Sequence, residues 1–180
     1  MSSECGPCGR GRARPSLRAL RGGVALATTL AGASACSAAS DPSRVEYNVT
    51  FPSTPAAVAV DGLEIHVFDA AKADLAGDVC ASLVVRRRSG QDLPAALVAR
   101  TDLTPCALRA GQGTLGVSYG PRAFLVVAQR ARQDFLIGCA YVDLSATTAP
   151  VEIPLALFAT TIAVPATTCA SLSDHCAGGC

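Results

Sequence analysis

The sequence has no tryptophan, one methionine, five phenylalanines and three tyrosines among its 180 residues. Glycan-binding clefts and platforms for single-stranded nucleic acid depend on stacking against aromatic rings, so the shortage of rings argues against both classes. A long hydrophobic run is also lacking. The apolar stretch at residues 22–35 would cover roughly 21 Å as a helix, which is short of the ~30 Å hydrocarbon core of a membrane.

Basic and acidic residues are unevenly distributed along the chain. Residues 1–21 hold five arginines and one glutamate, a net charge of +4, whereas residues 36–180 hold ten basic and thirteen acidic residues, a net charge of −3. A mildly acidic segment is a poor candidate for binding nucleic acid, because phosphates select basic surfaces. No arginine pair precedes the apolar stretch, so a twin-arginine export signal is not expected.

The first 35 residues have the layout of an export signal. Arginines precede the apolar stretch, and the small residues Ala33, Ser34 and Ala35 end it. Positive charge resists translocation, so the arginine-rich end would stay in the cytoplasm while the apolar stretch enters the membrane as a signal helix.

The segment Ala33-Ser34-Ala35-Cys36 resembles the lipobox of bacterial lipoproteins, in which small residues precede an obligatory cysteine. The family prefers leucine where this chain has Ala33. The resemblance implies cleavage between Ala35 and Cys36 and transfer of a diacylglyceryl group to the Cys36 thiol. Ser37, which is not acidic, is compatible with sorting to the outer membrane of the cell envelope, on its periplasmic or surface face. The alternative is cleavage without lipidation, which would give a soluble secreted protein.

The cysteine count agrees with export. Of nine cysteines, Cys5 and Cys8 fall in the signal and Cys36 would take the lipid. The remaining six are an even number, and an oxidising compartment would pair them in three disulfides with 15 possible connectivities. These candidates are Cys80, Cys106, Cys139, Cys169, Cys176 and Cys180.

Short alternating apolar segments between glycines and prolines predict an all-β fold. The expected strands are 45–51, 63–68, 97–99, 117–119, 124–129, 135–142, 151–158 and 160–164. Pro52 and Pro55 are expected to end the first strand, Thr104-Pro105-Cys106 to form a turn, and residues 130–134 to form a hairpin loop. At most one short helix is expected, over residues 78–90, with Asp78 as its N-cap and Gly90 as its stop, and the alternative is that Val84, Val85 and the arginines 86–88 belong to a strand. The layout resembles the immunoglobulin-like or transthyretin-like antiparallel β-sandwiches of bacterial envelope proteins.

Individual positions refine this prediction. His66 lies opposite the apolar face of its strand, which predicts a solvent-facing side chain, and Pro154 predicts an edge strand. The arginine run 86–88 predicts a solvated helix face, or alternatively a contact with anionic lipid headgroups. Four side chains share one face of the strand 135–142 and are expected to be buried: Phe135, Ile137, Cys139 and Tyr141.

The predicted organisation is a signal peptide (1–35), a lipidated tether (36–44), a β-sandwich domain (45–165) and a cysteine-rich tail (166–180). We expect a non-enzymatic, lipid-anchored envelope protein that serves as a binding, adhesion or structural accessory module. Its expected partners are the membrane and another envelope protein, with no cofactor, metal or nucleic acid. The alternative is a secreted hydrolase, redox or metal protein that uses Cys176 and its neighbour His175.

Overall fold

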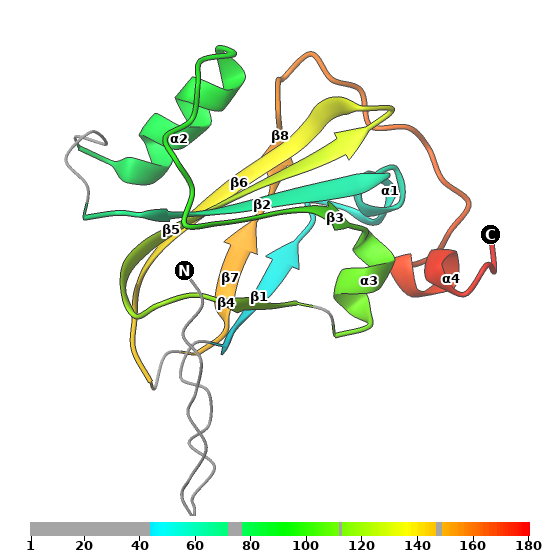
Figure 1. Ribbon diagram of the computed structural model, residues 1–180. Coiled ribbons are helices and arrows are strands. Elements are labelled where there is room, and N and C mark those ends of the chain that lie inside the picture. The colour runs from blue at the N-terminus through cyan, green and yellow to red at the C-terminus, as the bar shows by residue number, and fades with distance from the viewer. Residues whose placement is uncertain (1–43, 72–76, 112, 147–148) are drawn as a thin grey trace, which may run out of the picture. The chain divides into compact units, whose positions relative to one another are not determined.

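A computed structural model describes residues 44–71, 77–111, 113–146 and 149–180. The predicted signal peptide, Cys36 and the tether up to residue 43 lie outside the described residues. Within them the chain forms two β-sheets and four short helices (Figure 1), so the prediction of a β-rich fold is confirmed. In this part of the chain, no helix is long and apolar enough to cross a membrane.

The larger sheet has five antiparallel strands in the order β3-β2-β5-β6-β8. Its centre is the long hairpin of β5 and β6, which pair along almost their whole length. The strands are β2 (Gly62–Asp69), β3 (Val98–Leu103), β5 (Gly120–Arg130), β6 (Gln133–Leu144) and β8 (Ala156–Leu157).

The smaller sheet has the order β4-β1-β7. The strand β1 (Arg44–Thr50) pairs antiparallel with β4 (Thr114–Gly116) but parallel with β7 (Val151–Pro154), so the expectation of a purely antiparallel fold is wrong. A parallel pair needs a long crossover connection, and here most of the domain separates the two strands. The strand that contains Pro154 lies at a sheet edge, as predicted.

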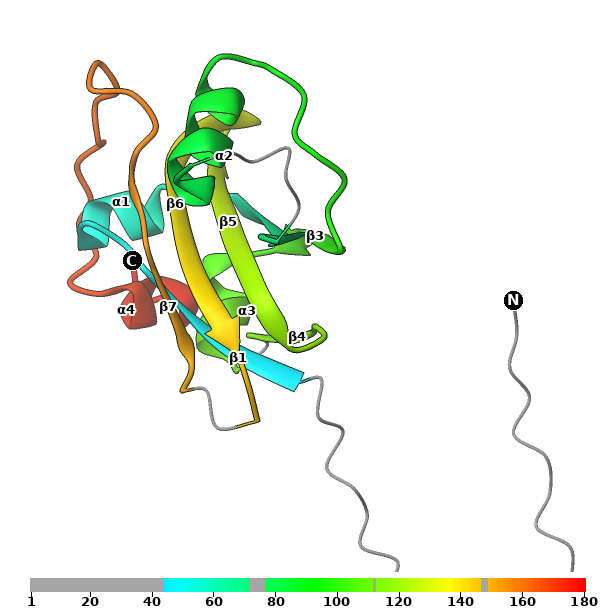
Figure 2. The ribbon, with the colours of Figure 1, turned by 90° about the vertical axis from the view of Figure 1, so that its left-hand side faces the viewer.

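The strand β5 is buried on both faces because its side chains alternate between two clusters. Phe124, Val126 and Ala128 belong to a cluster with residues of both sheets. Ala123, Leu125 and Val127 belong to a second cluster, on the opposite face, that includes Leu83 of helix α2 (Val79–Arg88). Figure 2 shows α2 lying across β5 and β6. The five-stranded sheet is therefore covered by the smaller sheet on one face and by α2 on the other.

The helix α2 is the one that the sequence predicts. The Asp78 side chain accepts a hydrogen bond from the Ala81 backbone N–H at 3.1 Å, which caps the first turn. Gly90, with φ of +68°, follows the last turn in the left-handed conformation that glycine adopts without strain.

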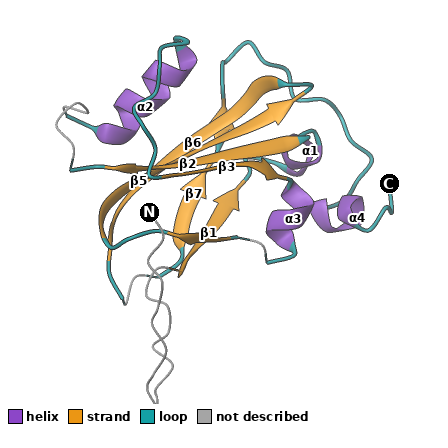
Figure 3. Ribbon diagram, in the orientation of Figure 1, coloured by secondary structure: helices purple, strands orange, loops and turns teal. Residues whose placement is uncertain are grey.

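Three further helices of one turn contradict the expectation of at most one helix. They are α1 (Thr54–Val58), α3 (Pro105–Arg109) and α4 (Leu172–Cys176), gathered at the end of the domain away from α2 (Figure 3). A serine or threonine hydroxyl caps each one: Ser53, Thr104 and Ser171. In α1 and α3 a proline follows the cap directly or after one residue, a combination that favours a helix start over the expected strand end or turn.

Several side chains and segments also differ from the prediction. Residues 117–119 and 160–164 form no strand. Tyr141 is 58% exposed, so its face of β6 is not buried along the whole strand. The His66 side chain is only 18% exposed and lies beside Glu64, which pairs with Arg87 of α2.

The β5–β6 hairpin turns through Ala131 and Arg132, with φ values of 49° and 64°. The turn is shorter than the predicted loop over residues 130–134. Both residues occupy the left-handed region that two-residue hairpins require, where asparagine and glycine are the favoured pair. We expect the double substitution Ala131→Asn and Arg132→Gly to raise the free energy of unfolding by about 1 kcal/mol in denaturant titration. An unchanged or lower value would contradict a strained turn.

Gly138 of β6 lies directly under the backbone of Pro154, where an added Cβ would collide with the Pro154 carbonyl oxygen. We expect Gly138→Ala to lower the free energy of unfolding by about 1–3 kcal/mol, because a carbonyl of the backbone must move. Gly116→Ala in β4 is the matched control, since nothing lies within 4 Å of its added Cβ. Equal unfolding midpoints for the two variants would disprove the close approach.

Candidate functional site

The six cysteines of the described residues form three disulfides, which confirms that they pair. The bonds are Cys80–Cys139, Cys106–Cys176 and Cys169–Cys180, each with a Cα–Cα separation of 5.4 Å. The first joins α2 to β6, the second joins α3 to α4, and the third closes a short loop around α4. From the sequence alone, all 15 possible connectivities remained open.

A cleft of about 380 Å³ lies beside the cysteine-rich tail, a volume within the usual range of small-molecule sites. Its walls come from the end of α1 and the residues just after it, from the start of α3, and from His175 of α4. Helix α4 contacts both α1 and α3, so the segment predicted as a tail is packed against the domain. The lining residues are Val58, Val60, Asp61, Thr104, Pro105, Cys106 and His175.

The predicted pair of His175 and Cys176 is not brought together as base and thiol. The Cys176 sulfur is bonded to Cys106. Neighbouring residues on a helix point about 100° apart, so they do not face each other. The imidazole instead lies with its Nδ1 atom 3.9 Å from the sulfur of Cys169.

Cys169, His175 and Cys180 bring two sulfurs and one imidazole nitrogen within 4.8 Å of one another. Thiophilic metals such as zinc use ligands of this kind. Metal binding requires deprotonated thiolates, whereas these two sulfurs are bonded to each other. In its disulfide form, the cluster therefore offers a disulfide between half-buried Cys169 and exposed Cys180, beside an imidazole. The crowding of three cysteines and a histidine into residues 169–180 was the signal for it in the sequence.

A second polar cluster, which sequence reasoning missed, lies between α2 and the larger sheet. Arg87 donates two hydrogen bonds to Asp134, at 2.6 and 2.9 Å, and one to Glu64 at 3.2 Å. Glu64 also accepts a hydrogen bond from Gln129 at 2.7 Å and lies 3.5 Å from His66 Nε2. The hydrogen bonds to Asp134 are the main cause that raises the pKa of the Arg87 guanidinium. The arginine run is thus not merely a solvated face, because Arg87 anchors the end of α2.

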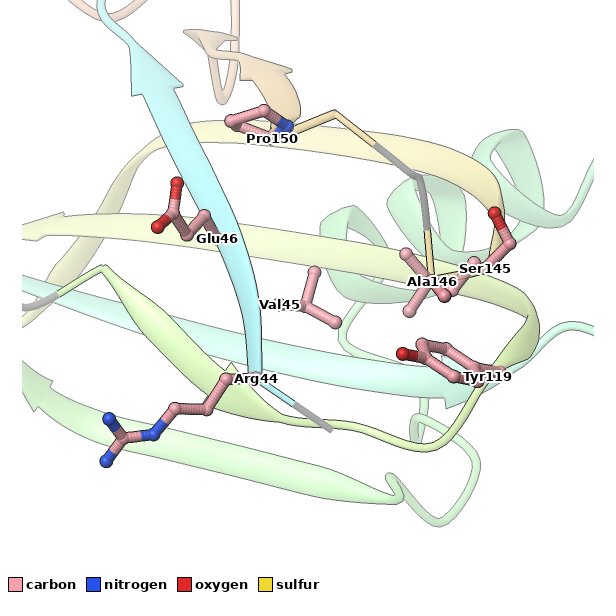
Figure 4. A pocket seen from close by; sticks show the side chains of 8 residues that line it. Arg44, Val45, Glu46, Tyr119, Ser145, Ala146 and Pro150 are labelled. Atoms are coloured by element: carbon pink, nitrogen blue, oxygen red, sulfur yellow. The ribbon is translucent and has the colours of Figure 1, made fainter. Parts of the chain in front are cut away.

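A smaller pocket of about 170 Å³ lies where β1 begins (Figure 4). Arg44 and Glu46 project from one side of β1, and Val45 projects from the other toward Tyr119. The volume is below the range typical of small-molecule sites, and its lining contains neither cysteine nor histidine.

Tyr47 of β1 carries a buried hydroxyl that has no hydrogen-bond partner among the described residues. Burial is the main cause that raises its pKa, so the phenol stays neutral at physiological pH. Its ring belongs to the cluster between the sheets, which gives it a packing role.

Comparison of the chain with protein-family models, curated proteins and solved structures found no match in any of the three.

The anchoring role of Arg87 is testable by truncation. We expect Arg87→Ala to lower the free energy of unfolding by about 1–3 kcal/mol, because it leaves Asp134 and Glu64 partly buried without their cation. Arg88→Ala is the control, since Arg88 is exposed and, among the described residues, donates a hydrogen bond to the Leu157 carbonyl alone, at 3.1 Å, and we expect a loss below about 0.5 kcal/mol. Similar losses in urea titrations of the two variants would contradict the assignment.

Proposed function

We propose that this chain is an exported lipoprotein of the cell envelope, anchored through Cys36, whose folded part is a non-enzymatic binding, adhesion or structural accessory module. The proposal includes outer-membrane sorting, consistent with Ser37, and a β-sandwich of the immunoglobulin-like or transthyretin-like type. Residues of both sheets share one apolar cluster, which supports the sandwich.

The observation that carries the proposal is the division of the cysteines. All six cysteines of the described domain are joined in disulfides, and such bonds persist in oxidising compartments outside the cytoplasm. The other three, Cys5, Cys8 and Cys36, precede the domain. Export explains both groups, because the signal removes two cysteines and the lipid takes the third.

The anchor would hold the domain close to the membrane. Seven residues, 37–43, separate Cys36 from Arg44, the first residue of β1, which allows a reach of at most roughly 30 Å when fully extended. The accessory role proposed here therefore applies to ligands or partner proteins at the membrane surface. The disulfides suit such a module, because they restrain its unfolded state where chaperoned refolding is limited.

The anchor is tested by Cys36→Ser expressed in a bacterium with a lipoprotein export pathway. We expect the wild-type protein to fractionate with membranes and to yield a diacylated N-terminal peptide by mass spectrometry. The variant cannot form the thioether. In cells grown with radioactive palmitate it should therefore stay unlabelled, and in a detergent partition it should move from the detergent phase to the aqueous phase.

The double variant Cys5→Ser and Cys8→Ser is the matched control, because it removes two thiols from the predicted signal without touching the lipid acceptor. Its membrane fractionation should equal that of the wild type. Membrane association of Cys36→Ser at the wild-type level would overturn the anchor. A wild-type protein that is soluble outside the cell and begins at an unmodified Cys36 would favour the secreted alternative.

A further inference from the structure

The Cys169–Cys180 disulfide differs from the other two in its surroundings. Cys139 packs against the cluster under α2, and the Cys106–Cys176 bond joins two helices across 70 residues of sequence. Cys169 and Cys180 are only 11 residues apart, and Cys180 is exposed. A solvent-accessible sulfur in a short loop is the kind that an external thiolate can reach.

Opening this bond leaves the fold cross-linked. Helix α4 remains joined to α3 through Cys106–Cys176. Its first turn stays capped by Ser171, whose hydroxyl accepts from the Asp174 N–H at 3.2 Å and donates to the Asp174 carboxylate at 2.9 Å. His175 is therefore held near residue 169 by contacts that do not depend on the Cys169–Cys180 bond.

The position of His175 makes one of the two sulfurs the better leaving group. Its Nδ1 atom is 3.9 Å from Cys169 Sγ, so a protonated imidazole would stabilise a thiolate there. Exchange is faster when the departing thiolate is stabilised. Attack is therefore expected at the exposed Cys180 sulfur, with Cys169 leaving toward the imidazole.

We propose that the Cys169–Cys180 disulfide is an exchange-active site that oxidises a dithiol substrate. A substrate thiolate attacks Cys180 Sγ, the bond to Cys169 breaks, and its electron pair leaves on Cys169 beside His175. The second substrate thiolate then attacks the substrate sulfur of the mixed disulfide and releases the Cys180 thiolate. The substrate dithiol loses two electrons and two protons and becomes a disulfide, and Cys169 and Cys180 become thiols.

This exchange is stoichiometric, with one substrate dithiol oxidised per disulfide opened, so it adds a redox reaction to the non-enzymatic role proposed above, and it does not rest on the lipid anchor. It also replaces Cys176 with Cys169 as the partner of His175 in the redox alternative that the sequence suggested. A failure of the Cys36→Ser test leaves it standing, because the exchange chemistry involves only residues 169–180.

Dithiothreitol serves as the probe dithiol for the full-length protein, purified without reductant. Samples are quenched with acid, and differential alkylation with peptide mass spectrometry follows each cysteine separately. We expect Cys169 and Cys180 to become alkylated at least about tenfold faster than the four other disulfide cysteines, with one oxidised dithiothreitol formed per opened bond. Equal rates for all three disulfides would overturn the proposal.

The role of His175 is tested with His175→Gln, which keeps a polar side chain but removes the titratable charge. We expect opening to slow by roughly three- to tenfold. His66→Gln changes the other histidine of the chain and should leave the rate unchanged. Equal rates for the two variants would exclude the assigned role.

A double variant, Cys169→Ser and Cys180→Ser, separates exchange from structural support. Since α4 remains tied to α3, we expect its Tm to stay within a few degrees of the wild type. A collapse of the fold would show that the bond is structural and would overturn the proposal.

Discussion

A strand that is buried on both faces is the constraint on which this structure depends. Every residue of β5 from Arg122 to Ala128 is buried, with alternate side chains entering opposite clusters. Such a strand is stable only if something covers each face of its sheet. The smaller sheet covers one face, and α2 covers the other.

The cover on the α2 side is secured by more than apolar contact. A ten-residue helix buries only Leu83 completely, so its own apolar face is small. The Cys80–Cys139 bond fastens its first turn to β6, and the Arg87–Asp134 pair fastens its last turn to the same strand. The two attachments fix the helix at both ends, which explains how a helix with a single fully buried side chain keeps its place over the sheet.

Local patterns in the sequence were enough to predict part of this fold. The alternation in 45–51, 63–68 and 135–142 and the cap at Asp78 correspond to β1, β2, β6 and α2. Helices α1 and α3 were missed because a proline close after Ser53 or Thr104 favours a strand end or a turn as well as a helix start, and α4 lies in the segment that was predicted as a tail. The segment 160–164 alternates like a strand but finds no neighbouring strand, and the pairing of β1 with β7 is set by tertiary contacts that no local pattern records.

The residue types of the candidate site could be predicted from the sequence, but their arrangement in space could not. The count of cysteines predicted three disulfides, and the crowding near residue 175 was the basis of the alternative of a hydrolase, redox or metal protein. Adjacency in sequence suggested Cys176 as the partner of His175, but a helix turns adjacent side chains apart and a bond to Cys106 holds Cys176 away. The sulfur that meets the imidazole comes from residue 169, six positions earlier.

The connectivity of the cross-links has a consequence for biosynthesis. No native bond joins cysteines that are consecutive among the six, because each bond skips at least one cysteine between its partners. A chain oxidised stepwise during its emergence would link Cys80 to Cys106 first, which is a wrong pair. Maturation therefore requires either that oxidation wait for β6 and α4 to fold, or that an isomerase reshuffle the early bonds.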